Sequence, residues 1–261
     1  MKRYFIFTDV HGHYDELMAA LKSKGYRKTN PNHIIVSIGD NFDRGPKSVE
    51  VYNFLKSQLK KGRAILLKGN HELLLAKCLK NKRLTLLDER NGLFTTVEEY
   101  RDINLLDDEE DALTHMVKEG WLKFIDDMKW YLKLGNYIIT HSWVPYDTVT
   151  GLDFFSDEHW KEAVWENGPE MYGDDNVFKR SKYTLINGHR FSWIYKTKFD
   201  PKFKDLSFDD LSKVPLEAYK PFRGTHIIAL DACTEVSKIV NVVVIDEKEN
   251  NKYVLNKELS D

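Results

Sequence analysis

The stretch TDVHGHYDEL (residues 8–17) decides the architecture of this chain, because an apolar pattern ends there at charged side chains. The preceding run, Tyr4–Phe7, is typical of a buried strand. It is followed within five residues by Asp9, His11 and His13. Burying a carboxylate beside imidazoles costs free energy unless a partner compensates. The stretch therefore predicts a strand whose end needs a partner such as a cation.

Strand and helix patterns alternate through the first 80 residues. Apolar runs typical of buried strands cover residues 3–7, 33–38 and 64–67. Apolar residues at helical spacing follow each run, at residues 14–24, 49–59 and 71–80. The order strand, helix, strand, helix, strand, helix favours a sheet that is covered by helices.

Two segments in the rest of the chain interrupt the pattern of apolar strands. Residues 80–132 are charged and predict a helical insertion, and residues 196–224, with three prolines, predict a long surface loop or flap. Apolar runs typical of strands return at 136–141, 183–188, 226–231, 239–246 and 252–255. We therefore expect an α/β (α+β-like) fold in a single domain, 1–261, with two sheets flanked by helices. The second half is expected to be the more antiparallel one.

Composition restricts the classes of partner. The chain has 261 residues, is 42% hydrophobic and carries a formal charge of −2, so it can form a core and has no basic excess for nucleic acid. No apolar run reaches the length of a membrane span or a signal peptide. The two cysteines, Cys78 and Cys233, lack metal-ligand spacing and predict reduced thiols. We expect a cytoplasmic protein without a membrane or nucleic-acid partner; the oligomeric state is open.

Polar side chains follow five of the predicted strands where each strand ends. They are Asp9 and His11; Asp40, Asp43 and Arg44; Asn70 and His71; His141; and His189. Sites in open α/β sheets form at the carboxyl ends of strands. Imidazole, carboxylate and amide ligands without thiolate favour Mn²⁺, Fe or Zn²⁺, and their number exceeds the needs of one ion. Two metals that share a carboxylate typically serve displacement at phosphorus.

Several motifs carry a resemblance to a known family. DVHGH (9–13), GDNFDRGP (39–46), KGNHE (68–72), His141 and NGHR (187–190) resemble metallophosphoesterases of the PPP serine/threonine phosphatase type. The bacterial and bacteriophage branch, with lambda-type protein phosphatases and symmetrical diadenosine tetraphosphatases, is the most similar. The resemblance is dense from residue 4 to about 75 and continues through isolated anchors to about 246. It implies the calcineurin-like metallophosphoesterase fold.

The resemblance also implies roles for individual residues. The first of two divalent ions would be held by Asp9, His11 and Asp40, and the second by Asp40 as the bridge with Asn70, His141 and His189. His71 resembles the general acid, Asp43 its orienting partner, and Arg44 the arginine that grips the phosphate. Mn²⁺ is the first choice of metal, with Fe or Zn²⁺ as alternatives.

Other positions depart from the family pattern. Lys68 stands where lambda-type enzymes have a second phosphate-binding arginine, and no arginine follows Trp165. We expect Lys68 or Arg190 to supply the further phosphate contact, with Arg180 ranked third. Asp231 ends a strand, and we expect it at most to contact the metal ligands without binding a metal itself. The aromatic residues Trp121, Phe124, Trp130 and Tyr131 are expected in the core of the insertion.

These features predict a metal-dependent phosphoric-ester hydrolase. The leading hypothesis is dephosphorylation of phosphoproteins or small phosphomonoesters, by direct attack of a hydroxide that bridges the two metals. The alternative is a dinucleoside polyphosphate hydrolase, whose site must hold a nucleoside on each side of the cleaved bond. A catalytically inactive interaction module of the same fold is a third hypothesis. The presence of all six ligands and His71 argues against it.

Overall fold

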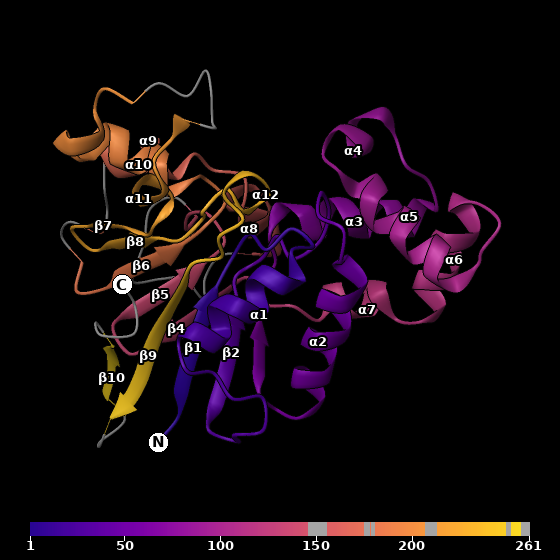
Figure 1. Cartoon of the computed structure of the whole chain (residues 1–261), viewed down its shortest axis with the longest axis horizontal. Coiled ribbons are helices and arrows are strands. Elements are labelled where there is room, and N and C mark those ends of the chain that lie inside the picture. Colours follow the sequence, from indigo (N-terminus) through magenta and orange to yellow (C-terminus); the bar gives the residue numbers. More distant parts are fainter. Residues whose placement is uncertain (146–155, 175–177, 179–180, 207–212, 249–251, 257–261) are drawn as a thin grey trace.

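Two five-stranded sheets form the centre of the protein (Figure 1). The computed structural model describes the chain except residues 146–155, 175–177, 179–180, 207–212, 249–251 and 257–261. The first sheet has the order β10 (Lys252–Leu255), β9 (Val242–Lys248), β1 (Arg3–Phe7), β2 (His33–Ser37) and β3 (Ala64–Leu66). The second has the order β4 (Tyr131–Leu134), β5 (Tyr137–Thr140), β6 (Thr184–Asn187), β8 (Ile227–Ala229) and β7 (Phe222–Gly224).

Both sheets are mixed. The pairs β1–β2, β2–β3, β5–β6 and β6–β8 are parallel, and the pairs β1–β9, β9–β10, β4–β5 and β7–β8 are antiparallel. Each antiparallel pair among the described strands includes a strand of the second half, as expected. The predicted α/β fold with two sheets and flanking helices is confirmed. The edge strands β4 and β7, each only a few residues long, were not predicted.

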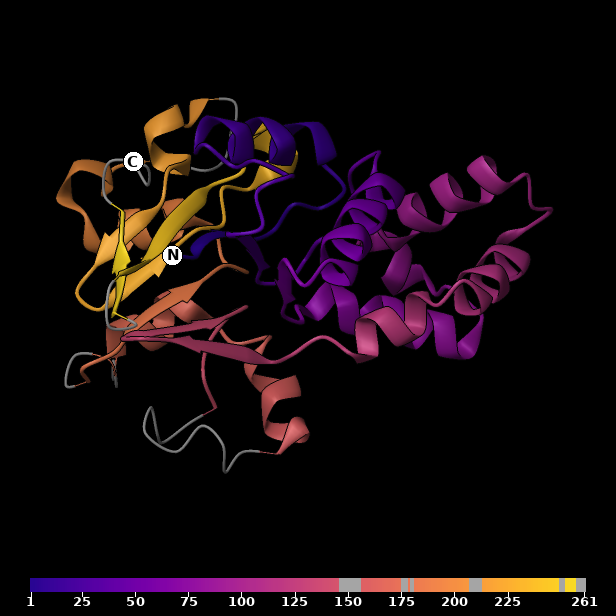
Figure 2. The same ribbon diagram turned by 90° about the horizontal axis from the view of Figure 1, so that it is seen from below.

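Alternating side chains explain why two sheets pack face to face. Tyr4 and Ile6 of β1 share a core cluster with Ile139 and Ile186 of the second sheet. The intervening Phe5 points to the other face of β1, against the helices. That outer face is covered by α1 (Tyr14–Ser23), α2 (Ser48–Lys60) and α3 (Asn70–Asn81). Figure 2 shows the two sheets as separate layers.

Short helices cover the outer face of the second sheet. They are α8 (Asp157–Ala163), α9 (Gly168–Asp174) and α10 (Ser192–Phe199). Trp160 and Tyr195 from these helices pack with Ile138 and Leu185 of the sheet. The helices were not predicted, because their apolar spacing is interrupted by polar residues over short lengths.

The expectation of a long loop at 196–224 was wrong for the described part of that segment. It contains the end of α10, a 3₁₀ helix (Pro201–Phe203), α11 (Leu216–Tyr219) and β7. Phe203, Ala218 and Tyr219 are buried together with Cys233, just before α12 (Thr234–Ser237). The prolines and charges that indicated a loop lie at the ends of these short elements. Residues 207–212 lie outside the described residues.

The segment predicted as a helical insertion is helical. It contains α4 (Leu86–Arg90), α5 (Leu93–Asn104), α6 (Glu109–Lys118) and α7 (Trp121–Asp126), which project to one side of the sheets (Figures 1 and 2). Trp121 stacks on Tyr52 of α2, with ring centroids 3.8 Å apart. Two aromatic residues expected in this core lie elsewhere: Tyr131 begins β4, and Trp130 lines a surface pocket. No described helix is both long and apolar enough to cross a membrane.

Candidate metal centre and active site

Backbone geometry gathers the predicted ligands at the ends of the strands. Asp9, His11, Asp40 and His189 all have positive φ angles, between 44° and 64°. Such conformations cost about 1–3 kcal/mol each in non-glycine residues, and they cluster at functional sites. A side chain at Gly69 would collide with the Asp40 carboxylate, so a glycine there lets the two loops touch. At these four positions the strained backbone accompanies the convergence of the predicted ligands, although residues outside the site, such as Lys82 and Leu105, have similar φ angles.

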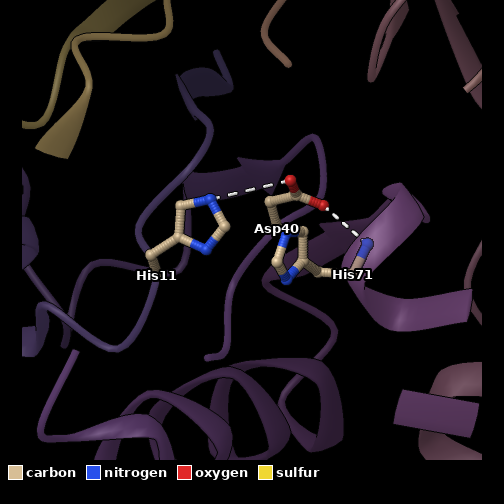
Figure 3. A group of neighbouring side chains, drawn as sticks. All are labelled: His11, Asp40 and His71. Atoms are coloured by element: carbon tan, nitrogen blue, oxygen red, sulfur yellow. Dashed lines mark hydrogen bonds and ion pairs between the residues drawn. The ribbon is translucent and has the colours of Figure 1, made fainter. Parts of the chain in front are cut away.

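Asp40 lies at the centre of the site. His11 and His71 form one compact group with it, and His141 and His189 form another. In each group the potential ligand atoms lie within 4.8 Å of one another. The His11 Nε2 to Asp40 Oδ2 distance is 3.7 Å, and the His141 Nε2 to Asp40 Oδ1 distance is 3.4 Å (Figure 3 shows the first group). One carboxylate shared by two groups is the arrangement expected of a bridging ligand.

The two remaining predicted ligands lie at the same centre. Asn70 Oδ1 is 2.9 Å from His141 Nε2. Asp9 belongs to neither compact group, but its Oδ2 accepts hydrogen bonds from Thr8 Oγ1 at 2.6 Å and the His189 backbone N–H at 3.0 Å. The structure thus brings all six predicted ligands together, four from loops of the first sheet and two from the second.

The donor set fits divalent cations. His189 Nε2 is buried and has no hydrogen-bond partner in the described part of the chain, which costs about 1–3 kcal/mol unless a ligand satisfies it. Burial, together with nearby His141, lowers the pKa of His189 to about 3, so its ring is neutral and able to bind a metal. Nitrogen and oxygen donors without sulfur suit Mn²⁺, Fe or Zn²⁺. The residues present therefore fit a pair of metal ions.

The positive charge of His141 and the negative charges of Asp40 and Asp9 partly compensate one another. Burial acts to lower the pKa of His141, but attraction to Asp40 and Asp9 outweighs it and raises the pKa to about 10. Burial raises the pKa of Asp9 to about 6, while His141 opposes the rise. A metal that binds His141 must displace its proton, because imidazole ligates in the neutral form.

His71 lies between a carboxylate and a guanidinium. Its Nδ1 is 2.9 Å from Asp43 Oδ2, and its Nε2 is 3.0 Å from Arg44 Nη2. Its backbone N–H donates to Asp40 Oδ1 at 3.0 Å, as Figure 3 shows. Since Arg44 can only donate, Nε2 accepts and Nδ1–H donates to Asp43. A phosphate that draws Arg44 toward itself would free Nε2 to carry a proton.

The helical insertion supports the backbone at Asp43 and Arg44. The sequence did not indicate this support. Thr96 of α5 donates from Oγ1 to Asp43 Oδ1 and accepts from the Asp43 N–H, both at 2.8 Å. The Gly92 carbonyl accepts from the Arg44 N–H at 3.0 Å. Thr96 and Asp43 are 53 residues apart, so no local pattern could reveal the contact.

Glu72 supports the loop that precedes α3. Its buried carboxylate accepts from the backbone N–H groups of Asp40, Asn41 and Gly69, and from the Asn41 side chain, at 2.8–2.9 Å. Burial raises its pKa, and Asp40 adds to the rise. Glu72 therefore fixes the loop that carries Asp40 to the start of α3.

Lys68 does not lie where it was predicted. Its Nζ donates to the Asp126 carbonyl at 3.0 Å and lies 4.7 Å from the centroid of the Trp130 ring. A lysine two residues before Asn70 has a long side chain that the ligand geometry does not constrain, and here it turns toward α7. The prediction that Lys68 grips the phosphate at the metals is therefore not supported.

Arg190 and Trp165 border the second ligand group. Arg190 directly follows His189, and its buried Nε has no hydrogen-bond partner among the residues that the structure describes, so it stays a candidate for phosphate binding. Trp165 is 45% exposed, with its ring 6.5 Å from that of His189. Asp231 is buried at the end of β8, and burial and Asp9 raise its pKa, in keeping with a place behind the ligands. Arg180 lies outside the described residues.

Comparisons with known proteins agree with this geometry. Over 154 residues the chain is 32% identical to the asymmetrical bis(5′-nucleosyl)-tetraphosphatase PrpE of Bacillus subtilis, covering 56% of this chain and 59% of that protein. Over 69 residues it is 41% identical to the symmetrical bis(5′-nucleosyl)-tetraphosphatase of Psychromonas ingrahamii, covering 26% and 24% of the two chains. The chain thus spans less than two thirds of the length of these curated relatives.

A solved structure and the family assignment complete the comparison. A serine/threonine phosphatase from Saccharomyces cerevisiae has a similar fold, with a TM-score of 0.57 and 13% identity over 98% of this chain and 79% of that one. Residues 2–217 match the family of calcineurin-like phosphoesterases. Since this match includes most of the chain and its six predicted ligands, the chain belongs to the calcineurin-like phosphoesterase family.

Proposed function

We propose that this metallophosphoesterase hydrolyses dinucleoside polyphosphates at a centre of two metal ions, with Mn²⁺ as the first metal to test. The observation that carries the reaction type is the pair of ligand groups that share Asp40. The substrate class is supported by two relatives whose names describe bis(5′-nucleosyl)-tetraphosphatases. The exposed Trp165 beside His189 also offers a surface on which a nucleobase can stack.

The residues of the chain divide the work among binding, orientation and proton transfer. The first cation would be held by Asp9, His11 and Asp40, and the second by Asp40, Asn70, His141 and His189. When bound, such cations neutralise phosphate charge and lower the pKa of water. Arg44 grips the phosphate as a fork of donors. His71 donates a proton to the leaving oxygen, and Asp43 holds its ring in place.

Hydrolysis of phosphoproteins or small phosphomonoesters is the second candidate. The same ligand groups and the same His71–Asp43 pair would serve a monoester, and no described residue of these groups distinguishes the two substrates. The inactive interaction module is disfavoured, because the six ligands and His71 converge at one centre. We further propose a single domain in the cytoplasm, since both cysteines are buried free thiols.

A substrate panel tests the proposal. Purified protein loaded with Mn²⁺ is given diadenosine tetraphosphate, a phosphopeptide and p-nitrophenyl phosphate. We expect kcat/KM for the dinucleotide to exceed that for either monoester by about 100-fold or more. A preference for the phosphopeptide would contradict the substrate class, and no hydrolysis of any of the three would contradict the reaction.

A further inference from the structure

Lys68 and the later residues of α3 line a pocket whose lining contains none of the predicted metal ligands and neither His71, Asp43 nor Arg44. The pocket has a volume of about 580 Å³ and lies among α3, α7 and α8. Its polar lining is mainly cationic and includes Lys68, Lys77, Lys80 and Lys161, with the Trp130 ring at one side. Asp126 and Asp157 are its acidic residues.

The charge of this lysine pocket is only partly neutralised. Four ammonium groups face two carboxylates of the lining, and Lys161 also pairs with Glu158 at 2.8 Å, which leaves one positive charge in excess. Lys80 Nζ lies 3.5 Å from Asp126, and Asp157 accepts from Trp130 Nε1 at 2.8 Å. Lys68 bonds to a neutral carbonyl, and Lys77 forms no ion pair among the described residues. The pocket therefore has cations to offer to an anionic ligand.

Helix α3 connects the pocket to the metal centre. The helix begins with Asn70 and His71 at the centre, and its later residues Ala76, Lys77 and Lys80 line the pocket. Seven residues separate Lys77 from Asn70, which is about 10 Å along the helix axis. A chain of phosphates that starts at the metals can extend over this distance, whereas a single phosphate cannot.

We propose that the lysine pocket binds the distal phosphates of a polyphosphate substrate while the scissile phosphate lies at the metals. This inference rests on the proposed function and specifies its substrate as one with several linked phosphates. Lysine ammonium groups bind phosphate oxygens as point charges from several directions. Lys68, at the rim two residues before Asn70, contacts the part of the chain nearest the centre.

Binding to the metal-loaded full-length protein tests the proposal without relying on turnover. The probes are a methylene-bridged, non-hydrolysable analogue of diadenosine tetraphosphate and inorganic phosphate, each measured by calorimetry. In the double variant Lys77→Gln/Lys80→Gln, we expect the Kd of the analogue to rise about 10-fold or more. The Kd of inorganic phosphate, which occupies only the metal centre, should stay within about twofold.

A matched control removes the same charge from elsewhere on the helices. The double variant Lys118→Gln/Lys123→Gln changes two exposed lysines that do not line the pocket, and it should bind the analogue like the wild type. Equal affinity of the pocket variant and this control, or no binding of the analogue to the wild type, would overturn the inference.

The proposed function and the pocket fail in different ways. If the dinucleotide is hydrolysed but the pocket variant binds the analogue normally, the proposed role of the pocket is wrong and the proposed function stands. If the dinucleotide is not hydrolysed but the pocket variant loses affinity, the substrate proposal is wrong and the pocket stands as a polyphosphate site.

Discussion

The metal centre and the lysine pocket adjoin the two ends of α3 but are built in different ways. At the centre, short side chains are placed by strained backbone, as the positive φ angles of Asp9, His11 and Asp40 show. In the pocket, long side chains extend from helix faces, and the side chain of Lys80 is 56% exposed. If both proposals hold, backbone geometry places the groups of the reaction, while long cationic side chains select the substrate.

Removing the shared Asp40 carboxylate should have the largest effect on metal binding and hydrolysis. In Asp40→Asn we expect bound metal to fall from two ions per chain to one or none, and hydrolysis to fall by about 10³-fold or more, because both ions lose a charged ligand. The control Asp246→Asn changes a carboxylate that pairs with Arg3 far along β9. Two tightly bound ions in Asp40→Asn, measured by elemental analysis, would show that Asp40 is not the bridge.

His71 comes next, because it separates catalysis from metal binding. His71→Asn should lower kcat about 10²–10⁴-fold with little change in KM, and both ions should remain bound. The loss should shrink for p-nitrophenyl phosphate, whose leaving group hardly needs a proton. His71 also lies within ligand distance of His11 and Asp40, so loss of one metal in this variant would make it a ligand instead.

Thr96 tests whether the insertion positions the catalytic residues. Thr96→Val keeps the shape but removes the hydroxyl that bonds Asp43, so we expect kcat to fall about 10-fold for substrates with poor leaving groups. The value for p-nitrophenyl phosphate should change much less, and Thr96→Ser should restore the wild-type rate. An equal loss on both substrates would point to a structural role alone.

The smallest predicted effect is on thermal stability, and it concerns Glu99 of the insertion. Glu99 accepts from the backbone N–H groups of Ser48 and Val49 at the start of α2. Burial and the neighbouring Glu50 raise the pKa of Glu99 from 4.5 to about 8. The folded state thus keeps a proton that the unfolded chain releases above pH 4.5, so stability falls as pH rises from about 4.5 to about 8.

Glu99→Gln should remove that dependence. We expect its Tm relative to the wild type to rise by roughly 2–4 °C between pH 5 and pH 8, the shift that about 1 kcal/mol produces in a chain of this size. Thermal unfolding at several pH values measures it. A constant difference in Tm across this range would mean that the Glu50–Glu99 pair does not titrate as described.

The sequence indicated that the predicted ligands converge, because these residues are tied to strand ends. Once β1, β2 and β5 were recognised, Asp9, Asp40 and His141 had to meet where those strands end. Lys68 shows the limit of this reasoning, because several rotatable bonds separate its ammonium from a well-placed backbone. Its partners, the Asp126 carbonyl and Trp130, lie 58 and 62 residues away in sequence.

The fold was predictable to a similar degree. Long apolar strands such as β9 are evident, whereas β7 has three residues and was taken as part of a loop. The hydroxyl of Thr96 reaches Asp43 only through the packing of α5 on α2, a tertiary contact without a local signal. Short edge elements and supporting contacts of this kind are decided by packing rather than by propensity.

Anomalous scattering from crystals grown with Mn²⁺ tests the central claim most directly. We predict two peaks within about 4 Å of each other, with Asp40 between them. Asp9 and His11 should contact one ion, and Asn70, His141 and His189 the other. A single peak, or two peaks that do not share Asp40, would contradict the account.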